Sequence, residues 1–427
     1  MKTERWFKKK TLVLTALMAF TMMSPLMAAE SQETLTLQQI VETAMKNNPA
    51  VVESQKRWEE KNDRVPVATA WPNPKFGIMK DDIQDGLFAP GTAMMTQYSI
   101  SQEIMNPAKL KAMGKMAGSD ARMAEANYQD KRLDAYTTAK TAYYDLLYAS
   151  KALEIGKENQ QLMGQLVQIA QVNYSTGMVS LQDTLRAQTE FSKMTTDLLS
   201  MASMEAVAKA KLNTAMGRQA DSALAVKEEF SAPAPNFDLV GLTKMATEAK
   251  PAIISMQRQV EMAQNGVELA HKQKLPDYEV TLAYKDYQEQ PNTWQIGVMA
   301  MLPIWQDKNK GEIKSANDNL AAAKASLANM QNMTGLDIQM ALTEAQTAWR
   351  KIDLYKTTIV PQAEQTYQAG VVSYTNGKVD FMAVLDSLNA LRNAKLGYYQ
   401  ARIDYEKAAA NLEKAVGKPL FASGAQP

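Results

Sequence analysis

Apolar positions along much of this chain recur at the spacing of a helix. From about 108 to 173 and from 312 to 373 the chain is rich in Ala, Gln, Lys and Glu with few helix breakers, and shorter helical stretches follow at 180–217 and 380–416. At ~1.5 Å per residue, each long helix would reach roughly 80–100 Å. That length exceeds the diameter of an ordinary globular domain, so each long helix must lie against neighbouring helices.

Two sets of residues in these stretches have the spacing of coiled coils, in which apolar side chains form a continuous seam. They are Ala139, Tyr143, Leu146 and Leu153 in the first half and Leu391, Tyr398 and Tyr405 in the second. The sequence therefore predicts two long helical hairpins, at 108–217 and 312–416, whose helices pack side by side.

Between the first and the second helix of each half, the period of the pattern changes from helical to 2. In the second half, Tyr278, Val280, Leu282 and Tyr284 alternate with polar or small residues, and another alternating run at 294–302 follows a polar turn. This pattern predicts a pair of strands within about 278–304.

The first half carries a less regular strand pair at about 74–104, where Lys80, Asp81 and Asp82 interrupt the alternation. Strands of about ten residues with one apolar and one polar face have the length and pattern of transmembrane barrel strands. Four strands cannot close a barrel, because the smallest membrane barrels have about eight, and lipid-exposed sheet edges are forbidden. A membrane interpretation therefore requires several copies of the chain, and the alternative is two hairpins packed on soluble helices.

The two halves of the chain are versions of one unit. Residues 172–217 recur 200 positions later as 372–417, and a second match at an offset of 202 sets Ile40 against Leu242. Such self-similarity indicates a tandem duplication. The predicted parts are a first repeat at 30–230, a Pro-rich linker at 231–236, a second repeat at 237–420 and a C-terminal tail at 421–427.

Each repeat is expected to open with one helix, at 35–70 and at 237–274. Thr36 and Asp238 stand where these helices begin. Because the side-chain oxygens of Thr and Asp accept hydrogen bonds from free N–H groups of the first helical turn, these residues are candidate N-caps.

The N-terminus has the form of a secretory signal peptide at 1–29. A basic stretch that ends at Lys10 precedes an apolar run at 12–23, and Met27-Ala-Ala29 offers a small-residue cleavage zone. Removal of five positive charges and Glu4 with this segment changes the formal net charge from +1 to −3. A chain with that charge has no general attraction to phosphate backbones, so nucleic acid is not an expected partner.

The chain contains no cysteine. Disulfides, thiolate metal sites and a lipid-modified N-terminal cysteine are therefore excluded, so the protein is not a lipoprotein. After Met27 no apolar stretch approaches the ~20 residues that a membrane helix needs. The protein is expected to leave the cytoplasm and, if it spans a membrane, to do so with strands.

Four motifs are specific enough to suggest a family. They are Tyr174-Ser-Thr-Gly177 with Leu185-Arg-Ala-Gln188, Tyr374-Thr-Asn-Gly377 with Leu385-Asp386, the opening Leu35-Thr-Leu-Gln-Gln-Ile-Val-Glu-Thr-Ala44, and Leu302-Pro-Ile-Trp305 before a charged helix. Together with the doubled layout, these motifs resemble the TolC family of outer-membrane efflux channels over about 35–420.

The resemblance implies a mostly α-helical fold with a membrane β-barrel. In such a homotrimer each tandem-repeat protomer gives four strands to one 12-stranded β-barrel and its helices to a long α-helical barrel across the periplasm. The implied function is the passive exit duct of a tripartite efflux pump in the outer membrane, with no enzyme activity and no cofactor. The implied partners are a periplasmic adaptor (membrane fusion protein), a proton-driven inner-membrane transporter and outer-membrane lipid.

The resemblance also assigns the two Tyr-x-x-Gly segments to the hairpin tips. Glycine adopts the left-handed backbone that such a reversal needs at little cost. The implied adaptor contacts are Ser175, Thr176, Gly177, Met178, Thr375, Asn376, Gly377 and Lys378, and the implied periplasmic gate residues are Asp183, Tyr374 and Asp386. The alternative for both aspartates is an ordinary dipole or capping role early in a helix.

Two other functions stay open on the sequence alone. A type I protein secretion duct uses the same channel fold, whereas a periplasmic coiled-coil adaptor would need lipoyl-like and barrel domains that the helical duplication does not provide. The 28 methionines are soft ligands for Cu(I) and Ag(I), which suits heavy-metal as well as drug export, although core filling explains methionine equally well. The lone His271 does not make a metal site, and none is predicted.

Overall fold

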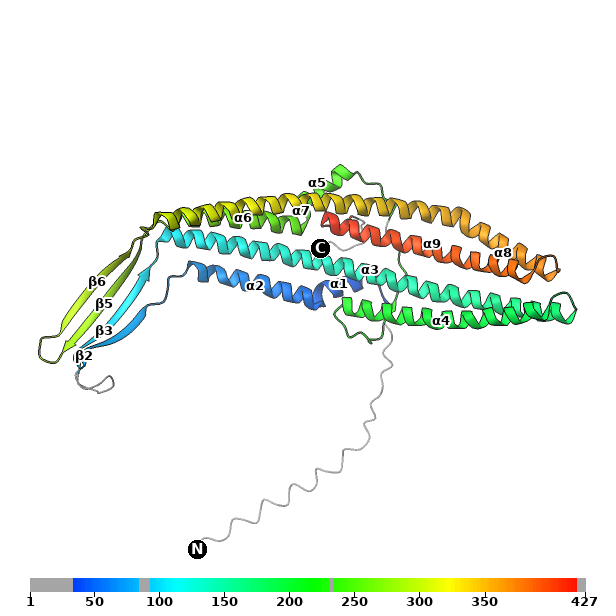
Figure 1. Cartoon of the computed structure of the whole chain (residues 1–427), viewed down its shortest axis with the longest axis horizontal. Helices are drawn as coiled ribbons and strands as arrows, with labels where there is room; N and C mark the ends of the chain where they lie inside the picture. The colour runs from blue at the N-terminus through cyan, green and yellow to red at the C-terminus, as the bar shows by residue number, and fades with distance from the viewer. Residues whose placement is uncertain (1–33, 84–92, 231–232, 421–427) are drawn as a thin grey trace, which may run out of the picture.

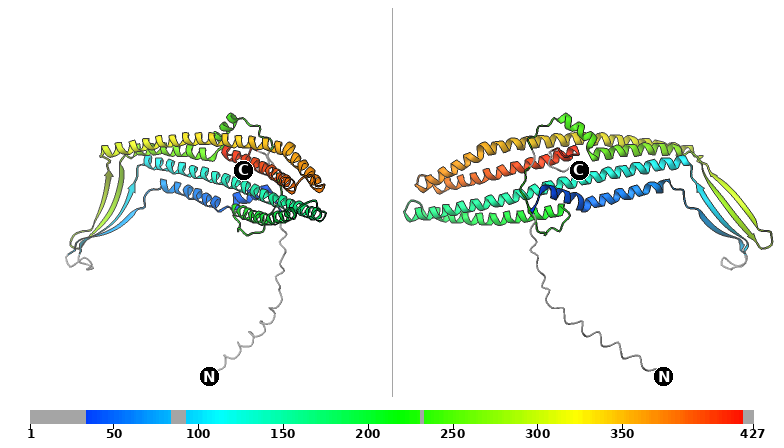
Figure 2. Two further views of the ribbon diagram at one scale, coloured as in Figure 1. Left: turned by 45° about the vertical axis from the view of Figure 1, so that its right-hand side comes forward. Right: turned by 180° about the vertical axis from the view of Figure 1, so that it is seen from behind.

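The computed structural model describes residues 34–83, 93–230 and 233–420. The expected signal peptide, the loop of the first strand pair and the C-terminal tail at 421–427 lie outside the described residues. The described chain is a long layer of helices with a sheet at one end and two hairpin tips at the other (Figure 1). Two further views show the same layer, with the sheet inclined to it (Figure 2).

Four antiparallel strands form the sheet. They are β2 (Lys75–Ile83), β3 (Ala93–Ile104), β5 (Asp277–Tyr287) and β6 (Thr293–Met301), in the order β2-β3-β5-β6. Both predicted strand pairs are confirmed, and β2 continues through the charged residues that interrupt its pattern. The hairpins of the two repeats join where β3 pairs with β5.

One face of this sheet is apolar across all four strands. Its cross-strand rows include Ile78-Tyr98-Tyr284-Trp294 and Phe76-Ile100-Leu282-Ile296. In a single copy these side chains are largely uncovered, with Trp294 69% and Ile296 76% exposed. The opposite face carries Ser99, Thr281 and Gln295, as the two-residue period predicts.

Two long helical hairpins run from the sheet to the other end of the molecule. The first consists of α3 (Pro107–Ser175) and α4 (Leu181–Ala215). The second consists of α7 (Gln306–Leu354), a π-helical segment (Tyr355–Ile359), α8 (Val360–Thr375) and α9 (Phe381–Val416). The predicted hairpins are confirmed, and the 69 residues of α3 span about 100 Å.

The π-helical segment has a local cause in the sequence. Pro361 lacks a backbone N–H, and its ring collides with the carbonyl of Thr357 in a regular helix. Widening of the preceding turn to a π-helix relieves this conflict without ending the helix. The matching residue of the first repeat is Gln161, and α3 runs through that position without a break.

The prediction of one opening helix per repeat is wrong. Each is two helices, α1 (Leu37–Asn47) and α2 (Pro49–Thr69) in the first repeat and α5 (Leu239–Ala249) and α6 (Pro251–Lys272) in the second. The breaks fall at Asn48 and Lys250, whose ψ angles of 124° and 118° are extended because a proline follows each. The predicted caps are confirmed, since Thr36 and Asp238 accept hydrogen bonds from backbone N–H groups of the first turns.

The helices stack end to end to complete the layer. Near the sheet the neighbours are α2, α3, α6 and α7, and near the tips they are α4, α3, α9 and α7 with α8. The end of α4 therefore meets the start of α2, and the end of α9 meets the start of α6. A two-residue parallel ladder of β1 (Thr34–Leu35) with β4 (Ala225–Val226) packs against the end of α4, and the sequence patterns did not reveal it.

A buried ion pair and hydrogen bonds join the two repeats along α3 and α9. The Lys140 ammonium lies 2.8 Å from the Glu413 carboxylate, which also accepts a hydrogen bond from the Tyr136 hydroxyl at 3.0 Å. Two turns along α9, the Glu406 carboxylate accepts a hydrogen bond from Tyr144 at 2.8 Å. Lys140 and both glutamates are buried. This α3–α9 seam fixes hairpin one against hairpin two within one chain.

Candidate functional site at the hairpin tips

Both hairpins reverse through the same backbone turn. In the first, the Gly177 N–H donates to the Tyr174 carbonyl at 3.0 Å and the Met178 N–H donates to the Asn173 carbonyl at 2.8 Å. This pair of bonds is the Schellman arrangement, which needs a left-handed residue after the helix. Gly177 has φ +76° and Gly377 has φ +66°, as the sequence predicts.

All eight residues predicted to contact a partner are exposed at these tips. They form two short exposed stretches, 175–178 and 375–378, at the end of the molecule opposite the sheet (Figure 1). A Cβ added at either tip glycine would meet no heavy atom within 4 Å, so the turns stand free in a single chain.

The tips also carry apolar side chains that the sequence reasoning did not single out. Val172 is 61% exposed, Val372 is 62% exposed and Leu181 is 51% exposed. Uncovered valines and leucines at an end of a molecule indicate a contact surface. The sequence does contain an indication of this surface, because a valine occurs at both Val172 and Val372, which are 200 positions apart in the duplication.

Tyr174 and Tyr374 occupy equivalent positions in sequence but different environments. Tyr374 is fully buried, whereas Tyr174 is 45% exposed. Tyr374 packs edge-on against Phe381, with ring centroids 6.0 Å apart, in a cluster that includes Leu166 of α3 and Ala187 of α4. The Asn173 amide donates to the Tyr374 backbone carbonyl at 3.2 Å, so this cluster joins the two tips.

The hydroxyl of Tyr374 is buried and has no hydrogen-bond partner in the described part of the chain. Burial, and secondarily the nearby Asp183 carboxylate, raise the pKa of Tyr374. The structure thus brings two of the predicted gate residues, Tyr374 and Asp183, close enough to interact electrostatically.

Asp183 has a structural role within the single chain. Its carboxylate accepts hydrogen bonds from the backbone N–H of Ser180 at 3.3 Å and from the Ser180 hydroxyl at 2.9 Å, while its own N–H donates to the Ser180 hydroxyl oxygen. This is a capping box at the start of α4. The capping alternative therefore holds for Asp183, and a role in the gate would be additional.

Asp386 is different, because the N-cap of α9 is Asp380, whose carboxylate accepts from the Ala383 N–H at 2.9 Å. Asp386 lies in the second turn with its side chain exposed. Within residues 34–83, 93–230 and 233–420 it forms no ion pair or side-chain hydrogen bond. Its charge therefore has no structural use in one chain.

Neither a cluster of metal-binding side chains nor a membrane-spanning helix is found in the described residues. No three His, Asp or Glu side chains there come together as a metal site, and His271 is exposed in the last turn of α6. No described helix combines the length and the hydropathy needed to cross a membrane.

Comparison with known proteins agrees with this architecture. A family model for outer membrane efflux proteins matches residues 40–218 and 242–418, one match in each repeat. The chain is 23% identical over 414 residues to the cobalt-zinc-cadmium resistance protein CzcC of Cupriavidus metallidurans, with 93% of this chain and 94% of that protein covered. It is 20% identical over 409 residues to the outer membrane protein TolC of Escherichia coli, with 89% and 82% covered.

The fold is that of solved outer-membrane channels. The structure of the channel OprN superposes with a TM-score of 0.77 at 15% identity and covers 89% of each chain. The chain therefore belongs to the outer membrane efflux protein family, and the resemblance seen in its motifs is confirmed. It is an outer-membrane efflux channel with a helical periplasmic portion, and its relatives are channel proteins rather than enzymes.

Proposed function

We propose that three copies of this chain join edge to edge into one continuous duct, closed by a 12-stranded β-barrel. This proposal is based on the four-stranded sheet, which has two free edges, β2 and β6. Because the four strands alternate in direction, β6 of one copy runs antiparallel to β2 of the next. Three copies give the even number of strands that an antiparallel barrel requires.

The apolar face of the sheet supports a lipid-facing exterior. Near the outer loops this face ends in the aromatic row Tyr98, Tyr284 and Trp294, and near the helices Trp71 and Trp305 are 53% and 72% exposed. Apolar bands bounded by aromatic residues at both ends are typical of outer-membrane barrels.

The helix layer has two further uncovered edges, which lie on α4 and α7. Leu185 and Leu199 on α4 and Leu336 and Met340 on α7 are each more than half exposed in a single chain. Because the two edges differ, they can pair head to tail between copies, which generates a closed ring. The same three-fold operation that closes the sheet therefore also covers these side chains.

In this assembly the six hairpin tips meet at the periplasmic end. The exposed residues 175–178 and 375–378, with Val172 and Val372, then form the surface for a periplasmic adaptor that connects the duct to an inner-membrane transporter. Asp386 and the Tyr374–Asp183 pair lie one or two turns inside the entrance and act as its gate.

Heavy-metal cations are the cargo class that the similarity to CzcC favours, since that protein is named for cobalt, zinc and cadmium resistance and matches along 93% of this chain. A heavy-metal-sensitive host that supplies a matching adaptor and proton-driven transporter tests this assignment. Restored growth in zinc, cobalt or cadmium supports it. Secretion of a polypeptide through an ABC exporter without any change in metal tolerance would instead select the type I secretion duct.

Engineered cysteines test the assembly, since the natural chain has none. Ile78→Cys in β2 is combined in turn with Trp294→Cys, Ile296→Cys or Val298→Cys in β6. One of these pairs should give a cross-linked trimer under oxidising conditions. Ile78→Cys with Tyr284→Cys is the matched control, because β3 separates those residues within the chain and no bond should form. Oxidised chains that stay monomeric in every β2–β6 pair would reject the closed barrel.

A further inference from the structure

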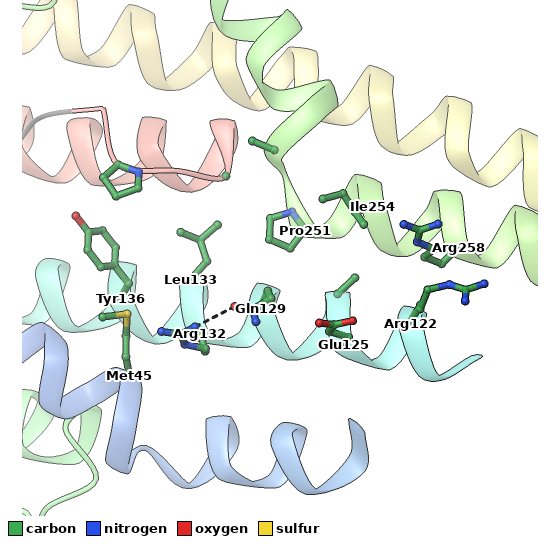
Figure 3. A pocket seen from close by; sticks show the side chains of 14 residues that line it. Met45, Arg122, Glu125, Gln129, Arg132, Leu133, Tyr136, Pro251, Ile254 and Arg258 are labelled. Carbon is green, nitrogen blue, oxygen red and sulfur yellow. Dashed lines mark hydrogen bonds between the residues drawn. The ribbon is translucent and has the colours of Figure 1, made fainter. Parts of the chain in front are cut away.

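A cavity of about 400 Å³ lies beside α3 where the end of α9 meets the start of α6 (Figure 3). It exists because α3 is continuous there, whereas α9 ends at Val416 and α6 begins at Pro251. The side chains of Leu133 on α3 and of Pro251 and Ile254 on α6 face this cavity. The volume is within the ~300–1,000 Å³ of small-molecule sites.

Three arginines line this cavity, namely Arg122, Arg132 and Arg258. The Arg122 and Arg258 guanidinium groups share the Glu261 carboxylate, at 2.5 Å and 3.0 Å. Arg132 donates a hydrogen bond to the Gln129 side-chain oxygen at 3.1 Å and has no ion pair among the residues that the structure describes.

The lining also includes one acidic side chain, Glu125. With Glu261 it leaves the three arginines one positive charge in excess. A cavity that combines apolar side chains with groups of net positive charge is complementary to a molecule with an apolar body and an anionic head. A cationic amphiphile of the same shape would find one carboxylate, Glu125, and three guanidinium groups in the lining, so the charge balance disfavours it.

The cavity lies inside one chain, at the centre of the helix layer. The edges that join copies in the proposed trimer are α4 on one side and α7 on the other. The cavity residues belong to α1, α3, the end of α5, α6 and the segment after α9. Assembly through these edges therefore leaves the site complete in each protomer.

We propose that this cavity is a binding site for an amphipathic organic anion. Its apolar body lies against Leu133, Pro251 and Ile254, and its acidic head group pairs with Arg132. Because the ligand touches α3, α6 and the residues after α9 together, binding fixes the end-to-end junction of the second repeat and stabilises the helix layer. The site goes beyond the export function and does not depend on which cargo passes through the duct.

Decanoate is a suitable probe, and decyltrimethylammonium is its control with the same tail and the opposite charge. Equilibrium dialysis is carried out with the full-length protein in lipid nanodiscs, and empty nanodiscs give the lipid background. We expect saturable binding of one decanoate per chain, no such binding of decyltrimethylammonium, and a higher melting temperature with decanoate only.

The variant Arg132→Gln should weaken decanoate binding about tenfold or more, because it removes the charged donor. Arg350→Gln, which changes an exposed arginine on α7, should leave binding unchanged. Ala126→Met fills the cavity from its α3 wall and should abolish binding without a change in the circular dichroism spectrum.

Three results would overturn the proposal. They are equal binding of both amphiphiles, wild-type affinity in Arg132→Gln, and decanoate uptake no greater than that of empty nanodiscs. Planar-bilayer conductance of the same preparation reports the channel separately, so loss of decanoate binding with normal conductance refutes only this site. Normal binding with no conductance would count against the duct alone.

Discussion

Glycines with positive φ occur at two kinds of position in this protein. Gly177 and Gly377 form the free turns at the tips, whereas Gly217 and Gly417 end the helices at the internal junctions. A Cβ on Gly417 would lie 2.4 Å from the Lys250 Cα, and one on Gly217 would lie 2.4 Å from the Asn47 carbonyl oxygen. The same conformation is therefore required for two reasons, reversal of the chain at the tips and close backbone packing at the junctions.

Replacement of these glycines by alanine distinguishes the requirement for chain reversal at the tips from the requirement for close packing at the junctions. Gly377→Ala should cost only the left-handed backbone strain, about 1–2 kcal/mol. Gly417→Ala adds a collision with the backbone of Lys250, so it should lower the melting temperature of the assembled protein clearly further. Gly311→Ala, in α7 with open space around it, is the control and should raise stability by up to about 1 kcal/mol. Equal losses for the two positive-φ glycines would contradict the tight junction.

The buried hydroxyl of Tyr374 should not stabilise a single chain. Because the hydroxyl has no partner in the described chain, Tyr374→Phe should leave stability unchanged or raise it by up to about 1–3 kcal/mol. Tyr374→Ala should cost about 3–5 kcal/mol, since it empties the cluster that joins the tips. Tyr174→Phe, at the exposed equivalent, should have almost no effect. A clear loss of stability in Tyr374→Phe would mean that assembly supplies the hydroxyl with a partner from another copy.

The tip turns are predictable from sequence because a Tyr-x-x-Gly segment appears twice at a fixed offset. The difference between Tyr174 and Tyr374 is not predictable in that way, since both tyrosines occupy the same place in the motif. It arises because Tyr374 faces the cluster between the hairpins, which depends on how α8 and α9 pack on α3. Likewise, the capping role of Asp183 follows from Ser180 three residues earlier, a local signal that sequence reasoning left undecided.

At the scale of helices, the α3–α9 seam distinguishes the two repeats. The residues at the offset of 200 from Lys140 and Glu413 are Met340 and Asn213, so the buried ion pair has no counterpart within the duplication. An ion pair that occurs at one of two similar interfaces favours one pairing of hairpins over its alternatives. We expect the seam to hold hairpin two against hairpin one of the same chain.

A double-mutant cycle measures this interaction. Glu413→Gln and Lys140→Met should each cost about 3–5 kcal/mol, because each removes the opposite charge from a buried ion pair. The double variant should lose much less than the sum of the two. Additive losses in urea unfolding would show that the pair contributes no coupling.

The same pair predicts a response to alkaline pH. Burial opposes the charged form of Lys140, but the Glu413 carboxylate and the Tyr136 hydroxyl outweigh it, so the pKa of Lys140 is raised. Its stabilising contribution is therefore complete below the unfolded lysine pKa of about 10.4 and is lost as pH rises through the folded value. The difference in melting temperature between wild type and Lys140→Met should stay constant from about pH 7 to 10 and then shrink. A difference that shrinks between pH 7 and 9 would contradict this assignment.

Helix and strand periods in the sequence predicted the hairpins and both strand pairs, because long amphipathic elements repeat their pattern many times. The breaks before Pro49 and Pro251 were missed because the apolar pattern continues across them while the backbone turns. The ladder of β1 with β4 is two residues long and pairs positions 191 residues apart, so it leaves no periodic signal. The π-helical segment does have a signal, Pro361, but only the structure shows that the helix continues through it.

At the scale of the whole molecule, incomplete surfaces recur along its full length. The sheet has two free edges, its apolar face is bare, and α4 and α7 expose leucine and methionine side chains. The apolar side chains are costly to expose to water, and the free strand edges are costly in lipid as well, so these surfaces require the membrane or another copy to cover them. The surfaces that a single chain leaves uncovered are therefore the strongest structural argument that several copies assemble.

We expect the charge of Asp386 to act in the assembled channel rather than in a single chain. In the proposed trimer three Asp386 carboxylates approach one axis at the periplasmic entrance, where a ring of negative charge attracts cations. Divalent or trivalent cations added on that side should block conductance in planar bilayers. Asp386→Asn removes the charge at nearly constant volume, so it should weaken both the block and the cation selectivity while the trimer still assembles. Asp404→Asn, an exposed position near the other end of α9, should leave both unchanged. If block by cations is the same in wild type and Asp386→Asn, the ring is not at the narrowest point, and Asp386 is an ordinary surface residue of α9.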